Sequence, residues 1–423
     1  MSICSLQIGQ CGNQVSSKFF YDMTKEWDDY SEHIRDRLVD TYFQVPSKGK
    51  PYPNSVLIDM EPKVVDRCIQ DSLNYDLWNF NSKFSYTKQH GSGNNWAYGY
   101  YLFDTDYGDE LLNVIRKLLE KIDYLSGFLV FQSLAGGTGS GFGTHLVEAI
   151  KMNNPKVNMI NVAIWPYSTG EVILQNYNSI LTISRLIEHS DGVISLYNDE
   201  EQTLCRLGKK IKNPTYYDIN TVISEKLLSV FFPCTNSSAK HLRLRNFDSN
   251  ILDNIISHLG VFPKTNMLTI NSFPLCSDDA KAFNALSWSG LMTEVLRKFQ
   301  NNSKHKANWC KSFGSIMYMR GTDVYKDIDI SSLSDPDIYN DLSSTGLKVY
   351  KDQYQLHGHE KSCTVLSNSS QITKPLEISL RKSVLMFKSK AYIHHYEKMN
   401  FTSDDFVTAF ETCRDALIKY RFN

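Results

Sequence analysis

Residues 134–141 (LAGGTGSG) carry four glycines within six residues, a composition suited to holding an anion. Glycine allows a positive φ and lets a ligand approach the main-chain N–H groups closely. Residues 128–131 before this stretch are typical of a buried strand, and residues 142–152 after it are typical of a helix. A glycine loop between a strand and a helix N-terminus can bind phosphate. The stretch therefore predicts a phosphate-binding loop, with a plain flexible turn as the alternative.

Two common phosphate-binding motifs are excluded by the residues that follow the glycines. Gly136 and Gly141 have the Walker A spacing, but Phe142 and Gly143 stand where that motif needs Lys and then Ser or Thr. The dinucleotide pattern G-x-G-x-x-G fails in both registers, because Phe142 and Thr144 occupy the third glycine position. A nicotinamide-dependent oxidoreductase is therefore disfavoured.

Three more polar loops follow predicted strands or precede predicted helices. They are residues 9–14 (GQCGNQ), 59–62 (DMEP) and 91–96 (GSGNNW). Carboxylates beside a phosphate-binding loop would repel the phosphate unless a cation lies between them, and Mg²⁺ is the usual cation. Four loops of this character together predict a nucleotide site with Asp59 and Glu61 near a magnesium ion.

The first half of the chain alternates predicted strands and helices, which indicates a doubly wound, mostly parallel sheet with helices on both faces. Ligands of such sheets bind at the carboxyl ends of the strands, where the polar loops lie. We expect strands at 3–8, 54–59, 128–131, 158–165 and 192–197, and helices at 111–122, 142–152, 175–188 and 198–207. After the first strand, the helical spacing of Val15, Phe19, Met23 and Trp27 predicts a further helix.

The second half is expected to form a smaller α/β domain and a helical end. A helix at 216–232 precedes short strands at 267–270, 315–320 and 363–366. Leu376, Leu380, Val384 and Phe387 share one apolar helix face, and Thr402 with Asp405 resembles a capping box that starts another helix.

Composition limits the class of protein. Hydrophobic residues make up 42% and charged residues 22%, and 45 basic against 46 acidic residues leave a net charge of −1. This balance gives no reason to expect nucleic acid or membrane as partners. No apolar run reaches the roughly 18 residues of a membrane span, and the first residues do not read as a signal peptide. Nine cysteines without C-x-x-C spacing favour reduced thiols in the cytoplasm.

The motifs GQCGNQ, DMEP, GSGNNWAYGY and AGGTGSGFG, in this order, resemble those of the tubulins. The resemblance extends through residues 177–181 (YNSIL) and 389–396 (SKAYIHHY). Residues 164–173 depart from the alpha and beta forms and resemble the delta form. The resemblance implies an α/β fold with a doubly wound GTP-binding domain at 1–197. A core helix and a smaller α/β domain follow at 198–370, and a C-terminal helical hairpin at 371–423.

The resemblance also implies a role for each residue that matches a family position around the phosphates. Glu61 would hold Mg²⁺ through water, with Asp59 in support. Asn94 would reach the γ-phosphate. The α- and β-phosphates and the ribose would lie against Gln10, Cys11, Ser133, Gly136, Gly137, Thr138, Gly139 and Ser140.

For the base, the resemblance assigns Asn198 and Asn220 to the guanine edge and Tyr216 to stacking. One Asn amide supplies both a donor and an acceptor, as that edge requires. Glu171 is the candidate for a ribose contact. Taken singly, Cys11 could be a small buried residue, Asn198 a helix N-cap and Tyr216 part of the core.

Hydrolysis in this family uses an acidic residue that reaches the nucleotide of the next subunit. Asn254 stands at that position here, with Asp253 one residue earlier, so hydrolysis is expected only in trans and to be weak. The alternative is that both residues are solvated helix surface. The chain ends without the glutamate-rich tail of alpha- and beta-tubulins.

The function implied by the resemblance is that of a GTP-binding cytoskeletal subunit in the cytoplasm, pairing end to end with itself or with other tubulins. The delta form further implies centrioles and basal bodies, with their proteins as partners, triplet microtubules and cilium formation. The alternative is a regulatory GTP-dependent protein of the same family that does not polymerise.

Overall fold

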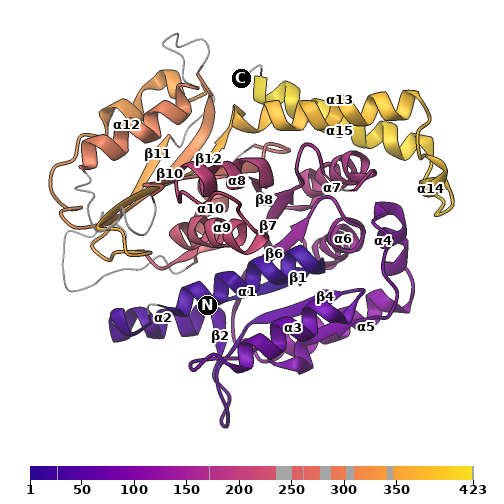
Figure 1. Cartoon of the computed structure of the whole chain (residues 1–423), viewed down its shortest axis with the longest axis horizontal. Coiled ribbons are helices and arrows are strands. Elements are labelled where there is room, and N and C mark those ends of the chain that lie inside the picture. Colours follow the sequence, from indigo (N-terminus) through magenta and orange to yellow (C-terminus); the bar gives the residue numbers. More distant parts are fainter. Residues whose placement is uncertain are drawn as a thin grey trace. The chain divides into compact units, whose positions relative to one another are not determined.

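A computed structural model describes residues 1–25, 27–170, 172–234, 250–260, 262–276, 287–301, 309–340 and 346–421 (Figure 1). The chain divides into two units, which are described one at a time. Unit 1 combines Met1–Asn198 with Lys374–Leu417, and unit 2 combines Asp199–Thr373 with Ile418–Asn423.

Unit 1 contains six parallel strands in the order β8-β7-β6-β1-β4-β5. The chain runs from β1 outward through β4 and β5, then returns to β6 and runs outward on the other side. This is the strand order of dinucleotide-binding folds, and its switch point lies between β1 and β6. The strands are β1 (Ser2–Ile8), β4 (Ser55–Asp59), β5 (Ser85–Thr87), β6 (Leu125–Ser133), β7 (Asn158–Trp165) and β8 (Gly192–Tyr197).

Helices cover both faces of this sheet, which confirms the doubly wound α/β fold. Helix α1 (Gly9–Lys25) packs on one face, where the rings of Phe19 and Phe131 lie 5.7 Å apart. Helix α6 (Gly143–Asn153) packs on the other face, with Gly143 against Ile8. The other helices in this part of the chain are α2 (Glu32–Tyr42), α3 (Pro62–Leu73), α4 (Trp96–Phe103), α5 (Asp106–Leu119) and α7 (Gln175–His189), with a small hairpin of β2 (Phe43–Gln44) and β3 (Tyr52–Pro53).

The C-terminal helices pack on α4 and α7 through an aromatic cluster. They are α13 (Thr373–Lys388), α14 (His394–Glu397) and α15 (Ser403–Arg421). The rings of Phe387 and Phe406 lie 5.4 Å apart, and Phe406 lies 5.0 Å from Tyr177 of α7. The expected helical end is present, and the Asp405 carboxylate accepts hydrogen bonds from the Thr402 N–H at 2.7 Å and its hydroxyl at 2.8 Å.

Unit 2 contains a mixed sheet in the order β11-β10-β12-β9, which confirms the expected second α/β region. Met317 and Met319 face α12, while Arg320 points to the opposite face and donates to the Phe232 carbonyl at 2.8 Å after α9. The strands are β9 (Met267–Phe273), β10 (Ser312–Gly321), β11 (Leu347–Asp352) and β12 (Lys361–Ser369); the helices are α8 (Asn198–Leu207), α9 (Tyr216–Phe231), α10 (Ile251–Leu259) and α12 (Trp288–Phe299).

The structure differs from the sequence expectation in a few elements. Trp27, which continues the apolar spacing of α1, lies in a separate 3-10 turn at Trp27–Asp29. Strands β5 and β11 and helix α12 were not expected from the sequence. Among the described residues, no helix is long and apolar enough to cross a membrane.

Close backbone contact between α1 and β6 gives a testable prediction. At an open helix position, replacing Gly by Ala stabilises a protein by about 0.5–1 kcal/mol. A Cβ on Gly12 would instead overlap the Phe131 carbonyl oxygen. We expect Gly12→Ala to lower the free energy of unfolding of unit 1 by about 2 kcal/mol, a typical cost of overpacking.

The measurement is denaturant unfolding followed by tryptophan fluorescence and circular dichroism. Gln14→Ala, a change at a half-buried position of the same helix, is the control and should stay within about 0.5 kcal/mol of the parent chain. A higher free energy of unfolding in Gly12→Ala than in the parent chain would contradict the close contact between Gly12 and the Phe131 carbonyl.

Candidate nucleotide site at the sheet switch point

The loops after β1 and β6 meet at the switch point of unit 1. Gly9 has φ +73°, and a Cβ there would lie 3.0 Å from the Gly139 main-chain nitrogen. Gln10, which is exposed, and Cys11, which is half-buried, follow in the first turn of α1. Burial raises the pKa of the Cys11 thiol to about 12, so this side chain is a neutral thiol at pH 7. It can contact a ligand but is not an activated nucleophile.

The predicted glycine loop ends in one turn of π-helix, Thr138–Phe142. Gly141 and Phe142 donate to the Gly137 carbonyl at 2.8 and 3.3 Å. The N–H groups of residues 138–140 precede these bonds and have no acceptor within the turn, as at any helix N-terminus. Such amides, together with the helix dipole, favour an anion. The local geometry therefore supports the phosphate role that the sequence predicts for this loop.

A second loop, residues 91–95, lies against the glycine turn. The hydroxyls of Ser92 and Thr138 are hydrogen-bonded at 2.9 Å. Asn95 caps helix α4, because its side chain accepts from Ala97 N at 2.9 Å. The exposed Asn94 has φ +52°, and its side-chain oxygen lies 3.8 Å from the position of a Cβ on Gly136. Asn94 therefore lies beside the glycine turn, and its contact with a γ-phosphate stays a prediction.

Two carboxylates reach the same loops from the end of β4. Glu61 is exposed, and its carboxylate lies against Gly91. Asp59 is buried and accepts from Met60 N at 2.8 Å. Burial raises the pKa of Asp59 to about 6, although main-chain amides and the Thr138 hydroxyl act in the opposite direction. Burial therefore disfavours the charged form of Asp59, and a nearby cation would favour it again.

The chemistry of these donors fits Mg²⁺ only together with a ligand. Magnesium binds through one or two carboxylates, and phosphate and water oxygens complete its octahedron. Within the described residues, no group of three or more His, Cys, Asp and Glu side chains could hold a metal ion. A bound phosphate would supply the oxygens that Asp59 and Glu61 lack.

Asn178 of α7 joins these loops, and the sequence reasoning did not identify it. Its fully buried side-chain N–H₂ donates to the carbonyls of Asn94 at 2.8 Å, Ala135 at 2.7 Å and Gly136 at 3.1 Å. Its side-chain oxygen accepts from Trp96 N at 3.1 Å. The stretch 177–181 (YNSIL) carried part of the family resemblance, but nothing in it assigned a role to Asn178.

The remaining predicted residues of unit 1 have different surroundings. Ser133 ends β6, and its hydroxyl accepts from Ala135 N at 3.2 Å. The buried Ser140 hydroxyl donates to the Gly136 carbonyl. Asn198 is the half-buried residue that begins α8 after β8. Glu171 lies outside the described residues.

The other predicted residues belong to unit 2. Tyr216 and Asn220 are one turn apart on α9, so they share a helix face, and the Tyr216 side chain is 56% exposed. Asp253 and Asn254 lie in the first turn of α10; Asp253 is exposed and Asn254 is half-buried. The roles of these four residues stay predictions.

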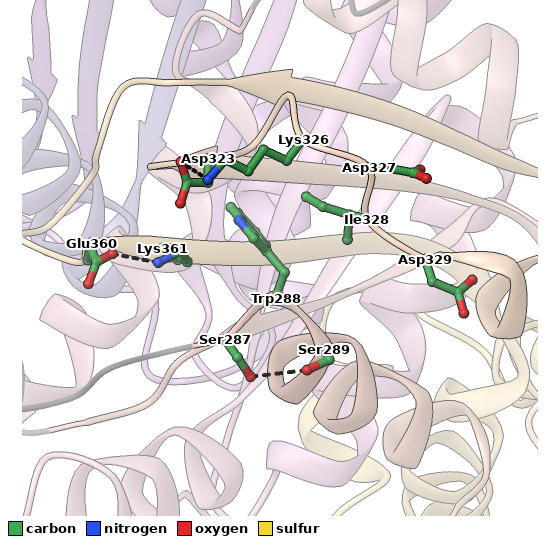
Figure 2. A pocket seen from close by; sticks show the side chains of 10 residues that line it. All are labelled: Ser287, Trp288, Ser289, Asp323, Lys326, Asp327, Ile328, Asp329, Glu360 and Lys361. Carbon is green, nitrogen blue, oxygen red and sulfur yellow. Dashed lines mark hydrogen bonds and ion pairs between the residues drawn. The ribbon is translucent and has the colours of Figure 1, made fainter.

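A pocket of about 550 Å³ lies elsewhere, in unit 2 (Figure 2). Its two lysines are paired with carboxylates, Lys326 with Asp323 at 3.1 Å and Lys361 with Glu360 at 2.5 Å. The hydrogen bonds from Lys361 and Thr322 lower the pKa of Glu360. The pocket contains none of the predicted nucleotide ligands. Its lining is Ser287, Trp288, Ser289, Asp323, Lys326, Asp327, Ile328, Asp329, Glu360 and Lys361.

Comparison with known proteins agrees with this geometry. Residues 2–206 match the model of the Tubulin/FtsZ family, GTPase domain. The chain is 31% identical to the Tubulin delta chain of Homo sapiens and 32% identical to that of Mus musculus, each match covering 99% of both proteins. It is 26% identical to the Tubulin beta-1 chain of Chondrus crispus, over 99% of this chain and 93% of the relative.

The family match covers β1, β4, β6, their loops and all but the last residue of α8, so it includes every loop that is predicted to bind phosphate. The similarity to the delta chains continues through unit 2 and the C-terminal helices. The chain therefore belongs to the tubulin family, and its residues 2–206 form the guanine-nucleotide-binding GTPase domain of that family.

Proposed function

We propose that this chain is a GTP-binding cytoskeletal subunit of the delta kind, which serves the triplet microtubules of centrioles and basal bodies and thereby cilium formation. The observation that carries the proposal is the similarity to Tubulin delta chains over 99% of the chain, at 31–32% identity against 26% for the beta chain cited above. Its partners would be tubulins, joined end to end, and proteins of the centriole.

The test is to locate the tagged full-length chain in a ciliated cell and to count centriolar triplets after its removal. Centriolar label and loss of triplets would support the proposal. Diffuse cytoplasmic label with normal triplets would overturn it. Sedimentation of the purified chain with GTP separates an assembling subunit from a non-polymerising regulator of the same family.

Mg²⁺ is proposed to bind beside Glu61, with Asp59 behind it and the phosphates completing its coordination. The metal would neutralise the charge of the γ-phosphate, and the buried charge of Asp59 would gain a partner. Residues 138–140 would donate main-chain N–H groups to the β- and α-phosphates, and Asn94 would approach the γ-phosphate from the opposite loop.

Replacing Glu61 by Ala should weaken GTP binding about tenfold, or about 1.4 kcal/mol, and GDP binding less, because GDP lacks the γ-phosphate. Affinities are measured by equilibrium titration at fixed free Mg²⁺. Asp71→Ala, which removes an exposed carboxylate from α3, the helix that begins directly after Glu61, is the control. Equal weakening of GTP and GDP binding would show that Glu61 supports the loop rather than the metal.

Guanine recognition is proposed to use Asn198, Asn220 and Tyr216. A site that hydrogen-bonds a substrate group can reject analogues lacking it by a factor of up to about 10⁴. Asn220→Asp should weaken GTP binding more than tenfold, because the carboxylate cannot donate to the guanine oxygen. Competition between labelled GTP and unlabelled ATP or GTP measures this, with Asn153→Asp on an exposed helix end as the control. Unchanged GTP affinity would remove Asn220 from the site.

Hydrolysis is proposed to be weak, because Asn254 can orient a water molecule but is a poor general base, and Asp253 lies about 100° away around the helix. Asn254→Asp should raise phosphate release, and only at concentrations where subunits sediment as assemblies. Rapid hydrolysis by the dilute, monomeric parent chain would contradict a site completed in trans.

A further inference from the structure

The side chain of Asn178 has one hydrogen-bonding arrangement that satisfies its surroundings. Three carbonyl oxygens, those of Asn94, Ala135 and Gly136, face its nitrogen. Two donors, Trp96 N at 3.1 Å and the Tyr396 hydroxyl at 2.7 Å, face its oxygen. A primary amide offers two N–H donors and two acceptor lone pairs, so the three carbonyls share the two N–H groups and both lone pairs are used. The buried amide therefore fixes loop 91–95 to the glycine turn.

The contact with Tyr396 extends this arrangement to the C-terminal part of unit 1. Tyr396 is buried, and burial raises its pKa well above 10, so its hydroxyl remains a donor. A second bond, from the Asn95 side chain to the His395 carbonyl at 3.0 Å, joins the same two segments. On the outer side of the 391–398 segment, Tyr392, His394, His395, Glu397 and Lys398 are exposed.

We propose that Asn178 is a positioning residue that holds the two phosphate-facing loops together, and that its bond to Tyr396 couples nucleotide binding to the order of the exposed 391–398 segment. The proposal rests on the nucleotide site described above. Because coupling is reciprocal, a partner that orders the 391–398 segment would raise nucleotide affinity, and nucleotide would favour that partner.

The first test is hydrogen exchange of the full-length chain with and without GTP. In the parent chain, GTP should slow exchange in peptides from 391–398 by about fivefold, the lower end of typical couplings. In Tyr396→Phe this slowing should disappear, while GTP affinity stays within about threefold of the parent, since the bonds from Asn178 to the loops remain. An unchanged slowing in Tyr396→Phe would overturn the coupling.

Tyr177→Phe is the matched control. It removes another tyrosine hydroxyl from the same aromatic cluster, but that hydroxyl donates to the Ala391 carbonyl at 3.1 Å and makes no bond to Asn178. The nucleotide-dependent slowing should survive in this variant. If the slowing were lost in Tyr177→Phe as well as in Tyr396→Phe, its cause would be the packing of the aromatic cluster. That result would overturn the proposed coupling through the bond between Asn178 and Tyr396.

The second test uses Asn178→Asp, which keeps the shape and places an oxygen against the three carbonyls. GTP affinity should fall at least tenfold, and Asn153→Asp should leave it unchanged. Parent-like affinity in a folded Asn178→Asp chain would overturn the positioning role; if that variant does not fold, Tyr396→Phe decides the proposal. Failure of the parent chain to bind GTP would refute the nucleotide site itself. That result differs from one in which the parent binds GTP and the variants behave as the parent does, which would refute only the role of Asn178.

Discussion

The candidate site depends on main-chain atoms that touch where a side chain would normally separate them. Gly12 places α1 directly on the Phe131 carbonyl of β6, and Gly99 and Gly141 bring α4 onto the glycine turn. The first contact fixes α1 to the strand that leads into the glycine turn, and the other two fix α4 to the turn itself. Each contact is too close to admit even a methyl group, so the glycine turn cannot move relative to the sheet. The direction of its main-chain N–H groups is therefore fixed.

Because the turn is rigid, groups that attract an anion and a carboxylate that repels one can be held side by side in the candidate site. The turn presents main-chain N–H groups that favour an anion, while Asp59 brings a buried carboxylate against Thr138. Neither is stable in isolation, since unpaired amides and unpaired charge both lose hydration on burial. A metal-bound phosphate is the kind of ligand that satisfies the amides and the carboxylates together.

The sequence was sufficient for features whose signal is local. Glycine clusters after strands, the proline that starts α3 and the alternation of strand and helix are all encoded within about ten residues, and the α/β fold followed from them. Asn178 could not be found in this way, because its partners lie 84, 43 and 218 residues away along the chain. Strand β11 (LKVYKD) was missed because three of its six residues are charged, as in a polar loop, although its pairing with β10 places it in the sheet. Trp27 was misplaced because apolar spacing does not show where a helix ends.

The amides of residues 138–140 and the buried carboxylate of Asp59 would be paired only when a ligand is bound. Ligand binding would therefore add to the stability of the folded chain. A ligand that binds only the native state, at a free concentration about 1,000 times its Kd, adds about 4 kcal/mol to stability. Whole-protein stabilities are typically about 5–15 kcal/mol. A chain that binds guanine nucleotide in this way would therefore unfold more readily, and meet proteases more often in its unfolded form, when the nucleotide is removed.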